Sequence, residues 1–218
     1  MMRKLNLLIR GVLVFKDWPL GVLDRFKLLK PHKVILFRLR NGISFFLMQD
    51  GRKNAGEQGF GSFQEIFIED RYNKCYKLKS GDAVLDIGSG IGEYLVYALK
   101  KGATAIGYEA DERRVLFSRL NLLANRVEAE VNQKYVSSLD DVSGADFLKM
   151  DIEGGEFKIF RNTKDLRKFK NIAMEFHRLP EPIEEKLKAQ GFDVKTEYTG
   201  DKCGYLYATL NKPHQTED

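Results

Sequence analysis

A glycine-rich turn follows a short apolar segment, and an acidic residue stands just before it. Residues 84–92 read VLDIGSGIG, with Asp86 two positions before the first glycine. Glycines allow the backbone to turn sharply and to approach a ligand closely. The G-x-G-x-G spacing differs from the G-x-G-x-x-G of dinucleotide-binding turns, and the Lys-Ser/Thr pair of a phosphate-binding loop is absent. A carboxylate at position 86 would repel a pyrophosphate, but it suits the cationic amino group of a methionine moiety.

A second carboxylate, Glu109, ends the next predicted strand, 23 residues after Asp86. A carboxylate at that place can accept hydrogen bonds from both hydroxyls of a ribose. A tight turn without a ligand is the alternative interpretation, but it explains neither carboxylate. We therefore predict a nucleoside-binding site. Its members are Asp86, Gly88, Ser89, Gly90, Gly92, Tyr94, Glu109 and Ala110.

Three carboxylates, Asp151, Glu153 and Glu156, lie within six residues at the end of another predicted strand. Open α/β sheets bind ligands outside the carboxyl ends of their strands. In one interpretation, Asp151 caps a helix that starts at Glu153, and the acidic first turn favours the helix dipole. In another, Asp151, Glu153, Glu175 and His177 ligate a divalent cation, although the sequence does not show that they converge. Our prediction assigns no metal to the site.

Strands and helices alternate along most of the chain. The predicted strands span residues 83–87, 105–109, 129–136, 146–152, 172–176, 192–196 and 205–210. Helices are predicted over 91–101, 112–125 and 181–190, and another begins at 156–160. This alternation is typical of an α/β protein with a doubly wound, mostly parallel sheet, here of seven strands. A short link at 200–204 predicts a terminal hairpin and hence one antiparallel strand.

The N-terminal part predicts a smaller unit of helices and a β-hairpin. Residues 4–30 fit two helices that are broken at 17–19, and residues 33–40 and 43–48 fit two strands. The Asn41-Gly42 pair between these strands favours a tight turn in which both residues have positive φ.

The boundary between this unit and the rest of the chain is predicted at a polar, glycine-rich loop over 50–61. Ser62–Glu65 then has the form of a capping box that opens a short helix. We divide the chain into an N-terminal helical and β-hairpin extension, 1–61, and a main domain, 62–218.

Positive charge is concentrated at the N-terminus. Residues 1–60 hold 12 Lys and Arg against 4 Asp and Glu, which is a net charge of +8. Because the whole chain has a net charge of +5, residues 61–218 have a net charge of −3. Such a region can meet an anionic lipid, a nucleic acid or an anionic glycan. A solvated basic surface without a partner is equally compatible with the sequence.

The chain carries no pattern typical of secretion or of a membrane span. Arg10 and Lys16 interrupt the apolar N-terminus, no small-residue cleavage site follows, and no run of about 20 apolar residues exists. An amphipathic helix that packs on the core or rests on a membrane surface fits better. Cys75 and Cys203 match no zinc or CxxC spacing, which favours a reducing compartment. We expect a cytoplasmic protein, with peripheral contact to a membrane as an option.

Four segments together resemble a known family. Residues 84–94 (VLDIGSGIGEY) and 106–111 (IGYEAD) resemble the first two motifs of class I S-adenosylmethionine methyltransferases. Residues 146–156 (DFLKMDIEGGE) and 172–177 (IAMEFH) are similar to the FkbM methyltransferases, which typically show D-x-L-K-x-D-x-E-G-x-E and a later E-F-H. The resemblance implies the class I methyltransferase fold and S-adenosylmethionine as cofactor.

The resemblance extends from about residue 33 to residue 177. Glu65-Ile66-Phe67 and Tyr72 also fit the segment that leads into the first strand of that family. Ser89 and Gly155 stand where the family often has alanine. Both are exchanges between small residues, so they leave the interpretation unchanged.

Methyl transfer from a sulfonium requires an acceptor held in line, and a hydroxyl acceptor benefits from a general base. Asp151 and His177 are our candidates for that base, and Glu153 could hold the acceptor or a cation. The alternative for His177 is a structural role, because a lone histidine at the end of a buried strand often serves only in packing. His32 and His214 are predicted to be surface residues.

These residues predict an enzyme that methylates a hydroxyl of a small-molecule, carbohydrate or lipid-linked acceptor. The alternative is an RNA methyltransferase that uses the basic N-terminal region, although no Asn-Pro-Pro-aromatic motif is present. A fold that binds but no longer reacts is disfavoured by the intact Asp86, Glu109 and DIEGGE segment. Acceptor pockets are built from loops, and the candidate loops here are 50–61, 137–145 and 197–204.

Overall fold

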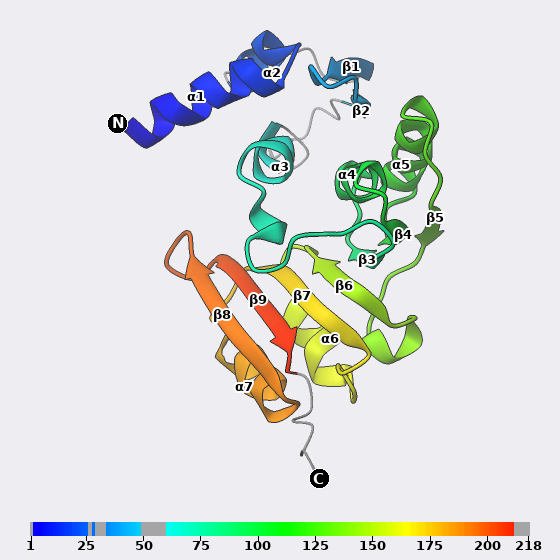
Figure 1. The fold of residues 1–218 in the computed structure, drawn as a ribbon, viewed down its shortest axis with the longest axis vertical. Coiled ribbons are helices and arrows are strands. Elements are labelled where there is room, and N and C mark those ends of the chain that lie inside the picture. Colours follow the sequence, from blue (N-terminus) through cyan, green and yellow to red (C-terminus); the bar gives the residue numbers. More distant parts are fainter. Residues whose placement is uncertain (1, 26–27, 29–33, 49–59, 212–218) are drawn as a thin grey trace.

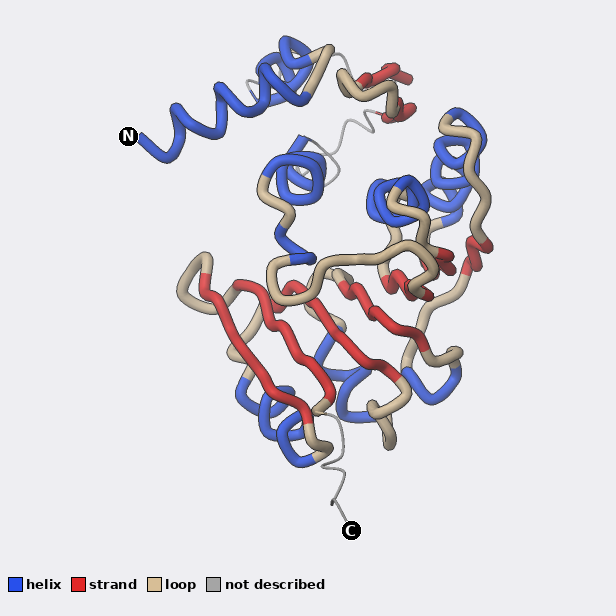
Figure 2. Tube along the Cα trace, viewed as in Figure 1, coloured by secondary structure: helices blue, strands red, loops and turns tan. Residues whose placement is uncertain are grey.

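The computed structural model describes residues 2–25, 28, 34–48 and 60–211. Its centre is a seven-stranded sheet in the order β5-β4-β3-β6-β7-β9-β8. The strands are β3 (Ala83–Ile87), β4 (Thr104–Glu109), β5 (Glu130–Gln133), β6 (Ala145–Met150), β7 (Phe169–Phe176), β8 (Phe192–Tyr198) and β9 (Gly204–Leu210). Strand β9 runs antiparallel to β7 and β8, whereas the pairings from β5 to β7 are parallel. The α/β fold, its mostly parallel sheet and the terminal hairpin are therefore confirmed (Figures 1 and 2).

Helices cover both faces of this sheet. Helices α4 (Glu93–Lys100) and α5 (Glu112–Ala124) pack into the core on one face, and α6 (Glu156–Asn162) and α7 (Glu181–Ala189) into the core on the other. Along β9, Tyr205 and Tyr207 belong to the first core, whereas Leu206 and Ala208 belong to the second. The alternation of side chains along each strand thus supplies apolar groups to two cores at once.

Parallel pairing brings the ends of three strands to one edge. Ile87, at the end of β3, pairs with Tyr108 of β4 and with Met150 of β6. The residues that follow these strands therefore emerge close together, although they lie far apart in the sequence. This edge carries the predicted site.

The N-terminal elements gather at one end of the molecule (Figure 1). They are α1 (Met2–Val14), α2 (Trp18–Arg25), the antiparallel hairpin β1 (Val34–Arg38) with β2 (Ser44–Met48), and α3 (Phe60–Phe63). The ring of Phe63 lies 5.1 Å from that of Phe37 and 4.9 Å from that of Phe45, measured between centroids. Aromatic packing thus joins the hairpin to α3. None of the described helices is long and apolar enough to cross a membrane.

Two asparagines of α5 bind the free edge of β2. The Oδ1 atoms of Asn121 and Asn125 accept hydrogen bonds from the backbone N of Phe46 (2.6 Å) and of Ser44 (3.0 Å). Their Nδ2 atoms donate back to the carbonyls of Phe46 (3.3 Å) and Ser44 (2.6 Å). The two side chains therefore give the hairpin the hydrogen bonds that a third strand would supply.

Two local predictions in this region were wrong. Gly42 has a positive φ of 89°, but Asn41 does not. The hairpin loop has three residues, 40–42, because Leu39 N donates to Ile43 O at 2.8 Å. Ser62 lies inside α3 and does not cap a helix. Its hydroxyl donates to Glu93 Oε1 at 3.0 Å, and one turn of π-helix, η2 (Gln64–Ile68), follows α3. Most of the predicted loop at 50–61 lies outside the described residues.

Candidate active site

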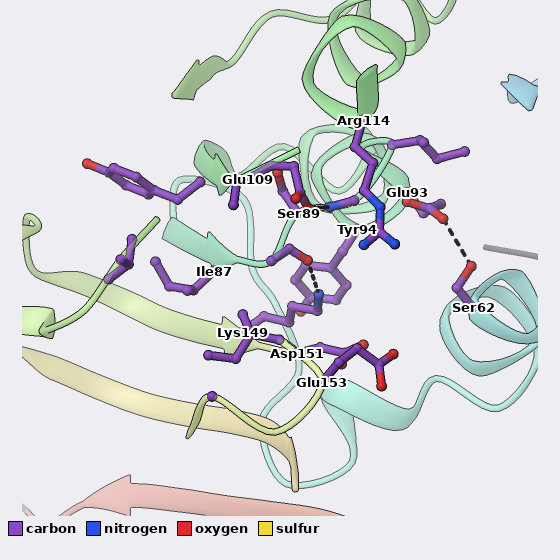
Figure 3. A pocket seen from close by; sticks show the side chains of 18 of the residues that line it. Ser62, Ile87, Ser89, Glu93, Tyr94, Glu109, Arg114, Lys149, Asp151 and Glu153 are labelled. Carbon is purple, nitrogen blue, oxygen red and sulfur yellow. Dashed lines mark hydrogen bonds between the residues drawn. The ribbon is translucent and has the colours of Figure 1, made fainter. Parts of the chain in front are cut away.

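A cavity of about 470 Å³ lies at the carboxyl edge of β3, β4 and β6 (Figure 3). Its volume falls within the roughly 300–1,000 Å³ that is usual for small-molecule sites. The lining includes most of the residues predicted to bind a nucleoside or to be catalytic. They are Gly88, Ser89, Gly90, Tyr94, Glu109, Ala110, Asp151 and Glu153. Asp86, Gly92 and His177 are not part of the lining.

Two glycines of the turn are required by packing around the cavity. A Cβ atom on Gly88 would lie 1.9 Å from the carbonyl oxygen of Asp151, and the residue has a φ of 78°. Gly88 therefore allows the ends of β3 and β6 to approach each other. A Cβ atom on Gly92 would lie 2.7 Å from Ser118 Oγ on α5, so Gly92 allows the turn to pack against that helix.

Glu109 holds the turn in place. Its Oε2 accepts a hydrogen bond from Gly90 N at 3.0 Å, and its Oε1 accepts one from Asp111 N at 2.9 Å. The side chain is almost fully buried, yet it lines the cavity. A carboxylate oxygen can accept more than one hydrogen bond. Glu109 can therefore support the turn and still bind two hydroxyls of a ligand.

Asp86 lies beneath the turn and is fully buried. Its Oδ1 is 3.0 Å from Nζ of Lys149, which also donates to the carbonyl of Gly88 at 3.0 Å. Burial raises the pKa of Asp86 to about 7, although Lys149 lowers it. Lys149 was missed by the sequence analysis. A lysine inside the apolar strand 145–150 was the available indication, because a buried cation requires a partner.

Asp151 reaches the cavity from the turn after β6. Its Oδ2 accepts a hydrogen bond from Tyr72 Oη at 3.0 Å, and its buried Oδ1 has no hydrogen-bond partner. The helix-cap alternative is wrong, because β6 ends at Met150 and α6 begins at Glu156, with Gly155 at the capping position. Asp151 therefore lines the cavity and has one buried carboxylate oxygen without a hydrogen-bond partner.

Two further carboxylates surround Asp151. Glu65, from the π-helical turn η2, lines the cavity, and turns of this kind occur often at functional sites. Burial, together with the charge of Asp151, raises the pKa of Glu65 to about 7. The same two causes raise the pKa of Glu175 to about 8. Glu65 and Tyr72 were recognised in the sequence only as parts of the family pattern.

His177 lies between two carboxylates. Its Nε2 is 3.2 Å from Glu153 Oε2, and its Nδ1 is 3.4 Å from Glu156 Oε1. Hydrogen bonds to these carboxylates raise the pKa of His177 to about 11. Glu156 Oε1 also accepts from the backbone N of Gly154 at 3.0 Å. The imidazolium therefore ties the turn after β6 to the end of β7.

The geometry brings together three of the four residues considered as cation ligands. One ligand atom each of Asp151, Glu153 and His177 lies within 4.8 Å of the others. Both ring nitrogens of His177 face carboxylates, Nε2 toward Glu153 and Nδ1 toward Glu156. An ion-paired histidine and a divalent cation held by Asp151, Glu153 and His177 are both compatible with this arrangement.

Solved structures share the fold of this chain. The Pyrococcus abyssi tRNA (uracil-54, C5)-methyltransferase in complex with S-adenosyl-L-homocysteine has a TM-score of 0.55 and 18% identity, over 81% of this chain and 44% of that chain. M. capricolum TrmK in complex with S-adenosyl-homocysteine has a TM-score of 0.51 and 14% identity, over 64% of this chain and 68% of that chain. At these identities the likeness concerns the fold alone, which is that of class I methyltransferases.

One curated relative is similar over a short segment. The tRNA (uracil(54)-C(5))-methyltransferase of Pyrococcus horikoshii is 34% identical over 56 residues, which are 26% of this chain and 14% of that protein. The chain therefore matches far less than two thirds of this relative's length.

The family follows from a match over most of the sequence. The methyltransferase FkbM domain matches residues 52–207, and the chain belongs to this family. The resemblance seen in the sequence is thereby confirmed. This domain implies S-adenosylmethionine as its cofactor.

The cavity fits this cofactor. Residues 88–91 of the turn line the cavity, and so do Glu109 and Asp151.

Proposed function

We propose that this methyltransferase methylates a hydroxyl group of a small-molecule, carbohydrate or lipid-linked acceptor, with Asp151 as the general base. The buried, unpartnered Oδ1 of Asp151 carries this proposal. A hydroxyl placed against it would satisfy the oxygen and give up its proton to it during the reaction. Tyr72 Oη fixes the carboxylate by donating to Oδ2.

The turn at 88–92, with Tyr94, Glu109 and Ala110, is the proposed cofactor site in a catalytic domain that spans 62–218. Bound S-adenosylmethionine supplies a methyl group on a positively charged sulfur. We propose that Glu109 binds the ribose hydroxyls. Asp86 does not line the cavity, so we propose that it supports the turn through Lys149. Residues 1–61 form the proposed N-terminal helical and β-hairpin extension.

Asp151 is a better base than His177. A base must have a free lone pair, and the nitrogens of His177 are held as donors by Glu153 and Glu156. We therefore assign a positioning role to His177: it orients Glu153, which lines the cavity beside Asp151. Glu153 then binds a second polar group of the acceptor.

The charge around Asp151 favours an acceptor without phosphates at the reacting end. Glu65, Asp151 and Glu153 line the cavity, and burial raises the pKa of Glu65 to about 7. The carboxylates of Asp151 and Glu153 would repel a phosphate beside them, whereas hydroxyls of a sugar-like molecule would donate hydrogen bonds to them.

An RNA acceptor is the second candidate. The segment shared with the tRNA (uracil(54)-C(5))-methyltransferase of P. horikoshii and the basic N-terminal region favour it. An RNA acceptor would use the N-terminal charge for its phosphates and place only a base or ribose in the cavity.

A labelling experiment separates the two candidates. The protein is incubated with S-adenosylmethionine labelled in its methyl group and with a cell extract divided into RNA, protein, lipid and small-molecule fractions. We expect label in the lipid or small-molecule fraction, stable to ribonuclease and to base. Label that ribonuclease releases would overturn the proposal in favour of RNA. An Asp151→Asn variant is the control for enzyme-dependent transfer.

A further inference from the structure

Helix α1 packs one of its faces on the protein. Leu7 and Val14 lie against the core, Phe15 just after the helix is buried in it, and Gly11 faces the side chain of Ile68. These positions recur every three to four residues, as expected for the inner face of a helix.

The opposite face of α1 is also apolar, but it is exposed. Ile9 and Leu13 are four residues apart, so they lie on the same face, and 52% and 67% of their surfaces are exposed. Helices that are apolar on both sides normally bury both of them. The outer face of α1 therefore lacks a partner among the described residues.

Further exposed apolar side chains follow in the same part of the chain. Among the described residues, seven of the thirteen exposed large hydrophobic side chains fall between positions 9 and 36. They are Ile9, Leu13, Trp18, Leu23, Leu28, Val34 and Leu36. All but Leu28 belong to α1, α2 and β1, and these elements lie together at one end of the molecule (Figure 1). Exposed apolar side chains concentrated in one part of a protein indicate an interaction surface.

The same segment carries the positive charge of the protein. Residues 1–40 contain ten Lys and Arg against two Asp and Glu, a balance of +8, whereas residues 41–218 sum to −3. A segment that combines basic residues with exposed aliphatic and tryptophan side chains complements an anionic lipid interface in both respects. RNA would be attracted by the charge, but it offers no apolar phase for Ile9 and Leu13.

We propose that α1 and α2 bind an anionic membrane surface, with α1 lying in the plane of the lipid headgroups and its outer face, Ile9 and Leu13, inserted among the acyl chains. Trp18, at the start of α2, then sits at the level of the headgroups, where tryptophan is enriched. The inner face of α1 stays packed on the core, so the catalytic domain is held at the lipid surface. This inference is independent of the acceptor proposed above.

Trp18 is the single tryptophan of the chain and therefore reports on this surface directly. The full-length protein is mixed with vesicles of phosphatidylcholine alone or of phosphatidylcholine with phosphatidylserine. We expect sedimentation with the phosphatidylserine vesicles, a blue shift of the tryptophan emission, and quenching by lipids brominated on their acyl chains. Salt should weaken the binding, because the attraction is partly electrostatic.

A pair of matched variants tests the role of the exposed face. Ile9→Gln with Leu13→Gln should lower vesicle binding by about tenfold or more, because two aliphatic side chains no longer enter the lipid. Leu116→Gln with Leu120→Gln is the control, since these residues of α5 are also exposed and four positions apart, with exposed fractions of 57% and 39%. The control pair should bind vesicles as the wild type does. Thermal unfolding of both pairs verifies the fold.

Three outcomes would overturn the proposal. The first is the absence of binding to phosphatidylserine vesicles. The second is an equal loss of binding in the two pairs of variants. The third is preferential binding of bulk tRNA over vesicles, unaffected by Ile9→Gln with Leu13→Gln, which would assign the basic surface to nucleic acid.

Discussion

Lys149 Nζ lies 3.0 Å from Asp86 Oδ1, and both side chains are buried beneath the glycine turn. Removal of one partner from a buried ion pair costs about 3–5 kcal/mol, because the other charge is left unpaired. Asp86→Ala should therefore lower the free energy of unfolding by about this amount and abolish binding of S-adenosylhomocysteine. Urea unfolding and titration calorimetry measure the two effects.

A double variant separates the charge from the support of the turn. Asp86→Asn with Lys149→Met leaves no unpaired charge, so most of the stability should return. Binding of S-adenosylhomocysteine should stay weak, because the carbonyl of Gly88 loses its bond from Lys149. Wild-type affinity in Asp86→Ala would contradict the role of this pair.

Asp151→Asn should remove turnover without removing the cofactor. Loss of a general base typically costs about 10²–10⁴ in rate, and the amide keeps the size of the side chain. Single-turnover transfer of labelled methyl to the acceptor fraction measures this loss. Tyr72→Phe, which only frees Oδ2 of Asp151, should reduce the rate by about tenfold. If Asp151→Asn turned over at the wild-type rate, another group would be the base.

His177 should remain protonated at neutral pH. Because hydrogen bonds to Glu153 and Glu156 raise its pKa to about 11, its ring protons should show no titration between about pH 5 and 9 in NMR spectra. His177→Gln identifies the resonance and should slow methyl transfer while binding of S-adenosylhomocysteine persists. A titration midpoint near that of a free histidine would refute the ion-paired state.

Stability should fall as the pH rises from about 5 to 8. Folding raises the pKa of Glu65 to about 7 and that of Glu175 to about 8, both from the ordinary value of 4.5. In this pH range the folded state therefore binds more protons than the unfolded state. Each such proton contributes a slope of up to about 1.4 kcal/mol per pH unit. Urea unfolding at a series of pH values measures the slope.

Glu175→Gln should flatten this pH dependence, because the amide does not ionise. Glu185→Gln, on the exposed side of α7, is the matched control and should leave the slope as it is. A slope that is the same in Glu175→Gln and the wild type would contradict the link to this carboxyl group.

Gly88→Ala should be far more damaging than Gly90→Ala. The new Cβ atom at position 88 would collide with the backbone oxygen of Asp151, which requires β3 and β6 to separate. At position 90 the nearest atom is Glu93 Oε2, at 3.2 Å, and this side chain can move. We expect a cost of about 1–2 kcal/mol for the positive φ at position 90 and a larger loss at position 88. Equal melting temperatures would contradict this difference.

The regular part of the fold was predictable because its pattern is local. The bounds of β3 were predicted to the residue, since an apolar run ended at Gly88. By contrast, the end of β6 was placed two residues too late, at position 152. Ile152 is apolar and continues the pattern, but the last pairing of β6 with β3 joins Met150 to Ile87, where β3 itself ends.

The site was predictable only in part, because its partners come from different strands and turns. The pairing of β3 with β6 places Lys149 beside Asp86, and no local pattern reveals that contact. Tyr72 reaches Asp151 from a short 3₁₀ turn, η3 (Arg71–Asn73), that has no periodicity. His177 was predicted to be functional, but its two carboxylate neighbours, Glu153 and Glu156, depend on tertiary structure.

Asn121 and Asn125 also set the point during synthesis at which the N-terminal hairpin can gain all its hydrogen bonds. The ribosome releases the N-terminal end first, so β1 and β2 emerge long before α5. Until residue 125 has left the exit tunnel, the outer edge of β2 has no amide side chains to bind it. A nascent chain that stops before this point therefore carries a hairpin whose outer edge lacks these hydrogen bonds, and such an edge is prone to pair with other chains.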